Sequence, residues 1–97
     1  MSGILSLQEW FAANCDGEWE HEHGITIDTI DNPGWRLRID LQETSLIGMK
    51  FESVEVERSE LDWIHCRVEK DAFVAFGGPR NLQEMVETFE TWRLSKS

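Results

Sequence analysis

The sequence predicts an α+β fold, a two-layer domain with an N-terminal helix, a four- to five-stranded, mostly antiparallel sheet arranged as a meander, and a C-terminal helix. Three observations predict it. Apolar residues recur at three- to four-residue spacing near both ends of the chain, they alternate with polar residues in its middle, and the links between the alternating runs are short. Two helices with one apolar stripe each can cover one face of a single sheet. The 97 residues form one domain, residues 1–97, because a chain of this length supports a single core.

The N-terminal helix is predicted from a start signal and a period. Ser6 and Glu9 have the spacing of a capping box, in which each side chain bonds a backbone amide of the other residue. We expect the helix to end by Asp16 and Gly17, where a turn-forming pair follows the last periodic position. The positions that follow the start signal at helical spacing are Leu7, Trp10, Phe11 and Asn14.

The next two runs predict a β-hairpin. Residues 25–30 and 35–41 alternate with a period of two, so each has one covered and one solvated face. In the second run the covered positions are Trp35, Leu37, Ile39 and Leu41. The link combines an acceptor side chain, a fixed backbone angle and a glycine, which is typical of a tight turn. Its residues are Asp31, Asn32, Pro33 and Gly34, and we expect the motif from Asp31 to Trp35 to serve the fold.

Three further strands follow a less regular stretch. Residues 42–50 are expected to form a loop or a short irregular strand. The skip from Phe51 to Val54 breaks the period of two, which predicts a bulge or a late strand start. Residues 64–68 alternate cleanly, and residues 72–76 form an apolar run, so both are predicted strands.

The C-terminal helix begins after a clear break. Gly77, Gly78 and Pro79 end the last strand, because this combination does not continue a ladder. Asn81 and Glu84 then repeat a capping signal. The apolar stripe of this helix consists of Leu82, Met85, Val86, Phe89 and Trp92.

The charge of the chain restricts its partners. Nineteen acidic and nine basic side chains give a formal charge of −10. Nucleic acids and anionic membranes are bound chiefly through Lys and Arg, so we expect neither as a partner. A basic protein surface is the natural complement. The N-terminus lacks the pattern of a signal peptide and no apolar run is long enough to span a bilayer, so we expect a cytoplasmic protein with reduced cysteines.

No catalytic residue, metal or cofactor is predicted. His21 and His23 could share one side of an extended segment as metal ligands, but no third ligand is signalled. Cys66 alternates with Ile64 and Val68 on the covered face of a strand, where cysteine acts as a small apolar residue. The sequence also contains no glycine-rich phosphate loop after a strand and no catalytic-triad order.

Carboxylates are concentrated in two segments. Residues 16–24 carry four carboxylates and no Lys or Arg, and residues 52–62 carry five carboxylates against Arg58, so each segment has a charge of −4. Such runs either keep a protein soluble or form a docking surface for a cationic protein. In a docking surface Trp19 is the expected aromatic anchor and Trp63 a second candidate. The residues predicted to contact a partner are Glu18, Trp19, Glu20, His21, Glu22, Glu55, Glu57 and Glu60.

The order of several short motifs resembles that of a known family. The motifs are Gly17-Glu18-Trp19-Glu20-His21, Asp31-Asn32-Pro33-Gly34-Trp35, Ile39-Asp40-Leu41, Asp62-Trp63 and Gly78-Pro79, closing on Phe89 and Trp92. From about Leu7 to Trp92 the chain resembles the immunity protein 53 family of bacterial polymorphic toxin systems. The resemblance implies a small antitoxin, encoded beside a toxin, that binds the toxin domain and blocks it. It carries over no catalytic residues.

Three functions are open at this point, and we favour the first. An immunity protein would cover the basic substrate-binding surface of a cognate toxin, which we expect to be a nuclease because nuclease clefts attract phosphate. A small thiol or metal-dependent enzyme would use Cys66 or the pair of His21 and His23. Members of the family are sometimes labelled rhodanese-related, but such a sulfurtransferase needs a cysteine at the head of an anion-cradling loop. A generic acidic interaction module would have no toxin partner.

Overall fold

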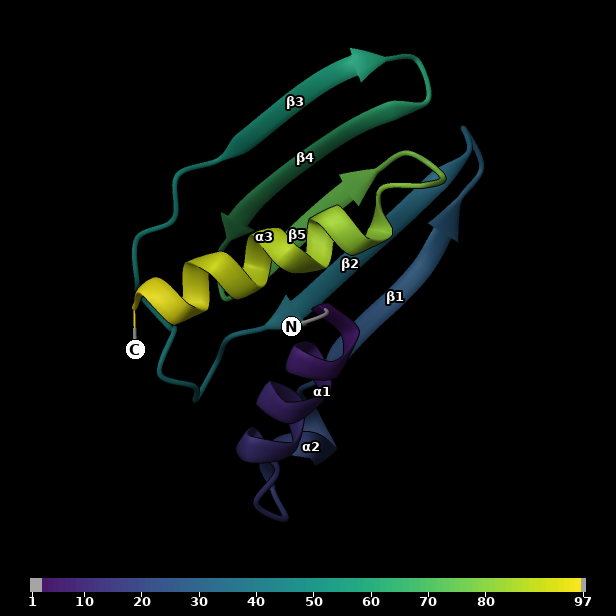
Figure 1. The fold of residues 1–97 in the computed structure, drawn as a ribbon. Helices are drawn as coiled ribbons and strands as arrows, with labels where there is room; N and C mark the ends of the chain where they lie inside the picture. Colours follow the sequence, from purple (N-terminus) through teal and green to yellow (C-terminus); the bar gives the residue numbers. More distant parts are fainter. Residues whose placement is uncertain (1–2, 97) are drawn as a thin grey trace.

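The computed structural model describes residues 3–96 and confirms the predicted α+β class (Figure 1). Five strands form one sheet in the order β1-β2-β5-β4-β3, and every pair of neighbours is antiparallel. After the β1–β2 hairpin the chain crosses to the far edge of the sheet and returns through two hairpins, so that β5 pairs with β2. The elements are α1 (Gly3–Asn14), α2 (Trp19–Glu22), β1 (Ile25–Ile30), β2 (Gly34–Asp40), β3 (Val54–Ser59), β4 (Asp62–Glu69), β5 (Ala72–Gly77) and α3 (Leu82–Ser95).

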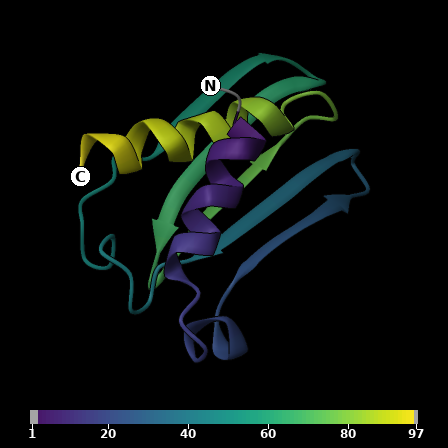
Figure 2. The ribbon, with the colours of Figure 1, turned by 60° about the horizontal axis from the view of Figure 1, so that its bottom comes forward.

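Both long helices lie on the same face of the sheet (Figures 1 and 2). Helix α3 lies across the central strands and presents the predicted stripe to them, with Met85, Val86 and Phe89 fully buried. Helix α1 packs beside α3, where the Trp10 ring meets Phe89 edge to face at a centroid distance of 5.1 Å. Several strand positions predicted to be covered join this core, as expected for a two-layer domain: Leu37, Ile39, Ile64 and Cys66. Phe73 and Ala75 of the apolar run in β5 join them.

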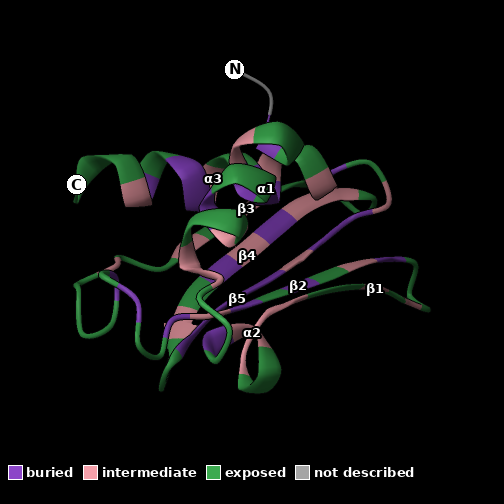
Figure 3. Cartoon of the chain, turned by 90° about the horizontal axis from the view of Figure 1, so that it is seen from below, coloured by how far each residue is buried: buried purple, intermediate pink, exposed green. Residues whose placement is uncertain are grey.

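The opposite face of the sheet is not covered by any helix in the part of the chain that the structure describes (Figure 3). Because side chains alternate along a strand, this face carries the residues that are out of phase with the core. We call it the open face. From β2 to β3 across the sheet, its side chains are Arg36, Arg38, Val74, Phe76, Trp63, His65, Arg67, Glu55 and Glu57.

The turn between β1 and β2 confirms the hairpin prediction. The strands pair from Ile30 opposite Gly34 to Ile25 opposite Ile39. Gly34 is required by its neighbour across the sheet, since a Cβ there would lie 2.2 Å from the carbonyl oxygen of Gly77. Just after the turn, the Trp35 indole N–H donates to the carbonyl of Pro79 at 3.0 Å. These contacts explain the glycine and the tryptophan of the motif through the fold itself.

The chain differs from the sequence predictions at several element starts. The predicted capping box is wrong, because α1 already includes Gly3 and therefore Ser6 lies within the helix. Gly3 packs so closely on Val86 that a Cβ would lie 2.8 Å from its Cγ1, which fixes where α1 crosses α3. The late strand start is confirmed, since β3 begins at Val54. Asn81 does precede α3, but its side chain makes no capping bond.

No helix within residues 3–96 has the length and apolar character needed to cross a membrane.

Candidate interaction surface

The first acidic segment, residues 16–24, forms a turn that leads into the short helix α2. The carboxylate of Asp16 accepts hydrogen bonds from the backbone N–H groups of Glu18 and Trp19, both at 2.9 Å. The carboxylate of Glu20 accepts from the backbone N–H groups of Asp16 and Gly17 at 3.0 and 2.9 Å. Backbone donors therefore hold the pKa of Asp16 and that of Glu20 below their usual values. Two of the four carboxylates in this segment stabilise its own backbone.

Trp19 is not available to a partner. Its side chain is only 3% exposed, and its indole N–H donates to the carbonyl of Gln42 at 2.8 Å. Its ring contacts Trp10 and Phe11 at centroid distances of 6.0 and 5.8 Å. The prediction that Trp19 is an accessible aromatic anchor is therefore wrong, because the ring joins α2 to the core. Glu18, His21 and Glu22 surround it with exposed side chains.

The two histidines of this segment lie in different environments. His21 is exposed on α2, whereas His23 follows the helix and lies 3.9 Å from Asp40, measured from Nδ1 to Oδ2. The predicted extended segment is instead a helical turn, so their side chains do not share one side of a strand. Among residues 3–96, no three His, Cys, Asp or Glu side chains lie close enough together to hold a metal ion.

The second acidic segment lies at the opposite corner of the sheet. Residues 52–62 build the edge strand β3 and the turn to β4, whereas α2 leads into β1 at the other edge (Figure 1). Four strand spacings, roughly 19 Å, separate these two edges. The structure therefore does not join the two groups of predicted contact residues into one continuous acidic surface. Glu55, Glu57 and Glu60 are all exposed on the β3–β4 hairpin.

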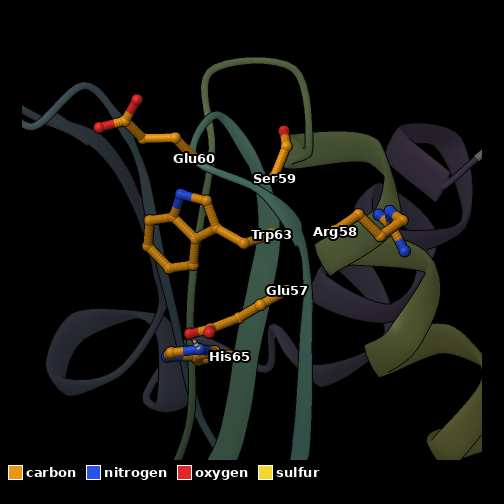
Figure 4. A pocket seen from close by; sticks show the side chains of 6 residues that line it. All are labelled: Glu57, Arg58, Ser59, Glu60, Trp63 and His65. Carbon is orange, nitrogen blue, oxygen red and sulfur yellow. Dashed lines mark hydrogen bonds and ion pairs between the residues drawn. The ribbon is translucent and has the colours of Figure 1, made fainter.

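A surface cavity of about 480 Å³ lies on this hairpin (Figure 4). Glu57 and Trp63 are direct cross-strand neighbours, and Glu57 Oε2 lies 2.8 Å from His65 Nε2. The rings of Trp63 and His65 meet at a centroid distance of 5.1 Å. In Figure 4, Glu60 extends from the turn to the same side as the indole. The lining consists of Glu57, Arg58, Ser59, Glu60, Trp63 and His65.

A second network fixes the turn end of the hairpin to the start of α3. The Arg58 guanidinium contacts Asp62 at 2.9 Å and Glu84 at 2.5 Å. Asn81 Nδ2 donates to both carboxylates, at 3.0 and 3.1 Å. The guanidinium lowers the pKa of Asp62, and the two carboxylates raise the pKa of Arg58. Asn81 thus joins the hairpin to the helix rather than capping it, which the capping signal could not reveal.

The open face between the two corners is a charged surface with an apolar centre. Arg36 pairs with Asp28 through Nε and Oδ1 at 2.9 Å, and Arg38 pairs with Asp40. Arg67 pairs with Glu69 at 3.2 Å and lies 5.8 Å from the centre of the Phe76 ring. No motif in the sequence pointed to a role for Arg36, Arg38 or Arg67. The period of two could have placed them on the face away from the core, but only the strand order brings them together.

Cys66 has neither the position nor the ionisation of a reactive thiol. Its side chain is 2% exposed within the core, as the strand pattern predicted. Burial raises the pKa of the thiol to about 11, so the thiolate is rare at neutral pH. Cys66 lies within β4 and not at the head of a loop, as a rhodanese-type cysteine would. The position and ionisation of Cys66 therefore do not favour its use as a catalytic thiol.

Comparison with known proteins gives one match. A family model described as Immunity protein 53 matches residues 4–93 of the 97-residue chain. No curated protein and no solved structure matches this chain.

Proposed function

Because the chain belongs to the Immunity protein 53 family, we propose that it is an antitoxin that binds and neutralises the cognate toxin domain of a bacterial polymorphic toxin system in the cytoplasm. The toxin is a nuclease in this proposal, and the antitoxin covers its basic substrate-binding surface. A nuclease cleft must attract phosphate, so an acidic protein can occupy the same electrostatic potential without being cleaved. Family membership is the observation that carries the proposal.

The exposed carboxylates support an electrostatic role in binding. Glu18, Glu22 and Glu55 make no hydrogen bond or ion pair through their side chains within residues 3–96, and neither does Glu60. Carboxylates without internal partners are free to attract a cationic surface, and such attraction speeds association. Glu57 also reaches solvent but is paired with His65. Trp19 is excluded from the contact set by its burial, and Glu20 is committed to the local backbone.

The antitoxin function is tested with the toxin domain encoded beside this chain. Co-expression of the wild-type chain should protect cells from that domain, and the two purified proteins should form a complex. In a cleavage assay the toxin should degrade DNA or RNA, and one equivalent of the chain should stop it. Protection without any nucleic-acid cleavage by the toxin would retain the antitoxin and reject the nuclease. Absence of both protection and complex formation would reject the antitoxin.

The acidic contact surface is tested by reversing charge at matched positions. One variant changes five carboxylates of the two acidic segments to Lys, and a control changes five exposed carboxylates elsewhere. We expect the first variant to associate with the toxin at least about tenfold more slowly at low salt, and the control to lose much less. If the first variant protected as well as wild type, these segments would not form the contact. The tested set is Glu18, Glu22, Glu55, Glu57 and Glu60, and the control set is Glu9, Asp31, Glu43, Asp71 and Glu87.

A further inference from the structure

We propose that the cavity on the β3–β4 hairpin receives one arginine or lysine side chain of the toxin, with its cationic group on the indole ring of Trp63. The inference rests on the proposed antitoxin function, and it names the part of the surface that recognises the partner. It is carried by the shape and charge of the cavity, by the indole N–H of Trp63 that bonds no described residue, and by the pairing of Arg58 with Asp62 and Glu84.

The lining of the cavity is complementary to a cation on a long apolar stem. Glu57 and Glu60 provide two carboxylates, and Trp63 provides an aromatic face between them (Figure 4). A cation over an indole ring is attracted by the ring quadrupole, and tryptophan is the strongest of the aromatic side chains in this respect. Carboxylates near the ring orient the cationic group through charge-assisted hydrogen bonds.

Trp63 differs from three of the other four tryptophans in the bonding of its indole N–H. The indole N–H groups of Trp19, Trp35 and Trp92 each donate to a backbone carbonyl of a distant segment. The indole N–H of Trp63 makes no hydrogen bond within residues 3–96, and its side chain is partly exposed on the open face. Its polar edge is therefore available to a partner. Aromatic side chains in such positions, bordered by charge, are typical binding anchors.

The guanidinium of Arg58 is paired with carboxylates outside the cavity lining. Arg58 contributes to the lining, but its guanidinium turns to Asp62 and Glu84 at the start of α3 (Figure 4). On the other side, His65 contacts Glu57 and so fixes the orientation of that carboxylate. The cavity thus keeps an ordered carboxylate, and a second one from Glu60, without an internal guanidinium between them.

One smaller groove on the molecule does not offer this complementarity. It lies between α1 and β1, and no charged side chain contributes to its lining. An apolar groove of this kind cannot select a cationic partner. Its lining consists of Ile4, Leu7, Gln8, Phe11, Ile25 and Ile27.

Replacement of Trp63 tests the inference with the toxin. Trp63→Ala and Trp63→Leu should each bind the toxin domain at least about tenfold more weakly, whereas Trp63→Phe should lose less because it keeps a π face. Circular dichroism should show that all three fold. If the wild-type chain binds the toxin domain and Trp63→Leu binds it equally tightly, the inference is overturned and the antitoxin function is retained.

A small probe tests the cavity without the toxin. N-acetyl-arginine amide, titrated into the 15N-labelled protein, should shift the indole N–H signal of Trp63 far more than that of Trp35, and the double variant Glu57→Gln/Glu60→Gln should weaken this response. N-acetyl-norleucine amide, which has an apolar side chain, should leave the signal in place. An equal response to both amides, or no response at Trp63, would overturn the inference even if the toxin itself did not bind.

Discussion

Residues 16–24 and residues 52–62 each carry a charge of −4, but they lie at opposite corners of the sheet and use their carboxylates differently. In the first segment, Asp16 and Glu20 bond backbone N–H groups, and the tryptophan between them is buried. In the second segment, Glu55 and Glu60 are exposed and their side chains make no hydrogen bond or ion pair within residues 3–96, and Trp63, the next residue after the segment, lines a surface cavity. Two segments of equal charge, each with a tryptophan within it or next to it, therefore have two different roles, one in folding and one suited to binding.

The difference has a physical origin in the two local folds. Residues 16–24 connect a helix to an edge strand through a tight turn, which leaves backbone N–H groups that need acceptors. The nearest acceptors are the carboxylates of the same segment. Residues 54–59 form an extended edge strand that pairs with β4 on one side, and within residues 3–96 the carboxylates of Glu55, Glu57 and Glu60 accept no hydrogen bond from a backbone N–H. A strand edge thus leaves its acidic side chains for solvent or for a partner.

The largest expected effect is a difference in stability between variants of Trp19, in the first segment, and of Trp63, the residue after the second segment. Trp19→Ala removes a fully packed ring, and it should lower the free energy of unfolding by about 3 to 5 kcal/mol. Trp63→Ala removes a partly exposed ring and should cost less than about 1 kcal/mol. Urea denaturation of both variants measures the loss in free energy of unfolding at each position. Equal losses at the two positions would contradict the assignment of Trp19 to folding and Trp63 to binding.

Acid should weaken the first segment through Asp16. Its pKa in the folded chain lies below the usual value of 3.8, chiefly because the backbone N–H groups of Trp19 and Glu18 bond its ionised form. The stabilisation is therefore complete only well above the unfolded-state pKa of 3.8, and it is lost as the pH falls through the lower, folded-state pKa. In urea denaturation between pH 5 and pH 2, Asp16→Asn should lose less stability than wild type, because its amide oxygen still accepts these bonds and does not titrate. If the stability of wild type and that of Asp16→Asn fell in parallel with pH, Asp16 would not contribute to the loss of stability in acid.

The hairpin should loosen locally when its attachment to α3 is removed. Arg58→Ala breaks the contacts to Asp62 and Glu84, so amide hydrogen exchange should become faster in residues 58–62 and remain unchanged in residues 16–24. Arg80→Ala is the control, since Arg80 is exposed and makes no ion pair within residues 3–96. Faster exchange in both acidic segments would mean that they do not behave as independent regions.

How far the sequence predicts these two regions depends on which interactions are local. Periodicity predicted the strands, the hairpin at Pro33 and the stripe of α3, because alternation and helical spacing report which face is covered. The burial of Cys66 followed from the same rule. The exposure of Trp19 was wrongly predicted because its cover comes from Trp10 and from the carbonyl of Gln42, which are distant in sequence. Composition gives the charge of a segment but not the donors that its carboxylates meet.

The candidate site was predictable only in part. Glu57 and Glu60, which the sequence predicts as partner contacts, are exposed and line the cavity, and the strand pattern placed Trp63 out of phase with the core. The cavity itself depends on the register that places Glu57 opposite Trp63, and on the turn that brings Glu60 beside them. Neither the register nor the diversion of Arg58 toward α3 leaves a signal in the amino-acid order.

The smallest expected effect separates carboxylates only two residues apart within the first segment. Glu18→Gln/Glu22→Gln should leave the urea midpoint at pH 7 unchanged, because neither carboxylate bonds a described residue. Glu20→Gln should lower the midpoint, since its two carboxylate oxygens accept from two backbone N–H groups and an amide has only one acceptor atom to offer them. The double variant could instead be destabilised as much as Glu20→Gln. This result would show that the first segment does not contain two kinds of carboxylate, one that bonds the backbone and one that is free to bind a partner.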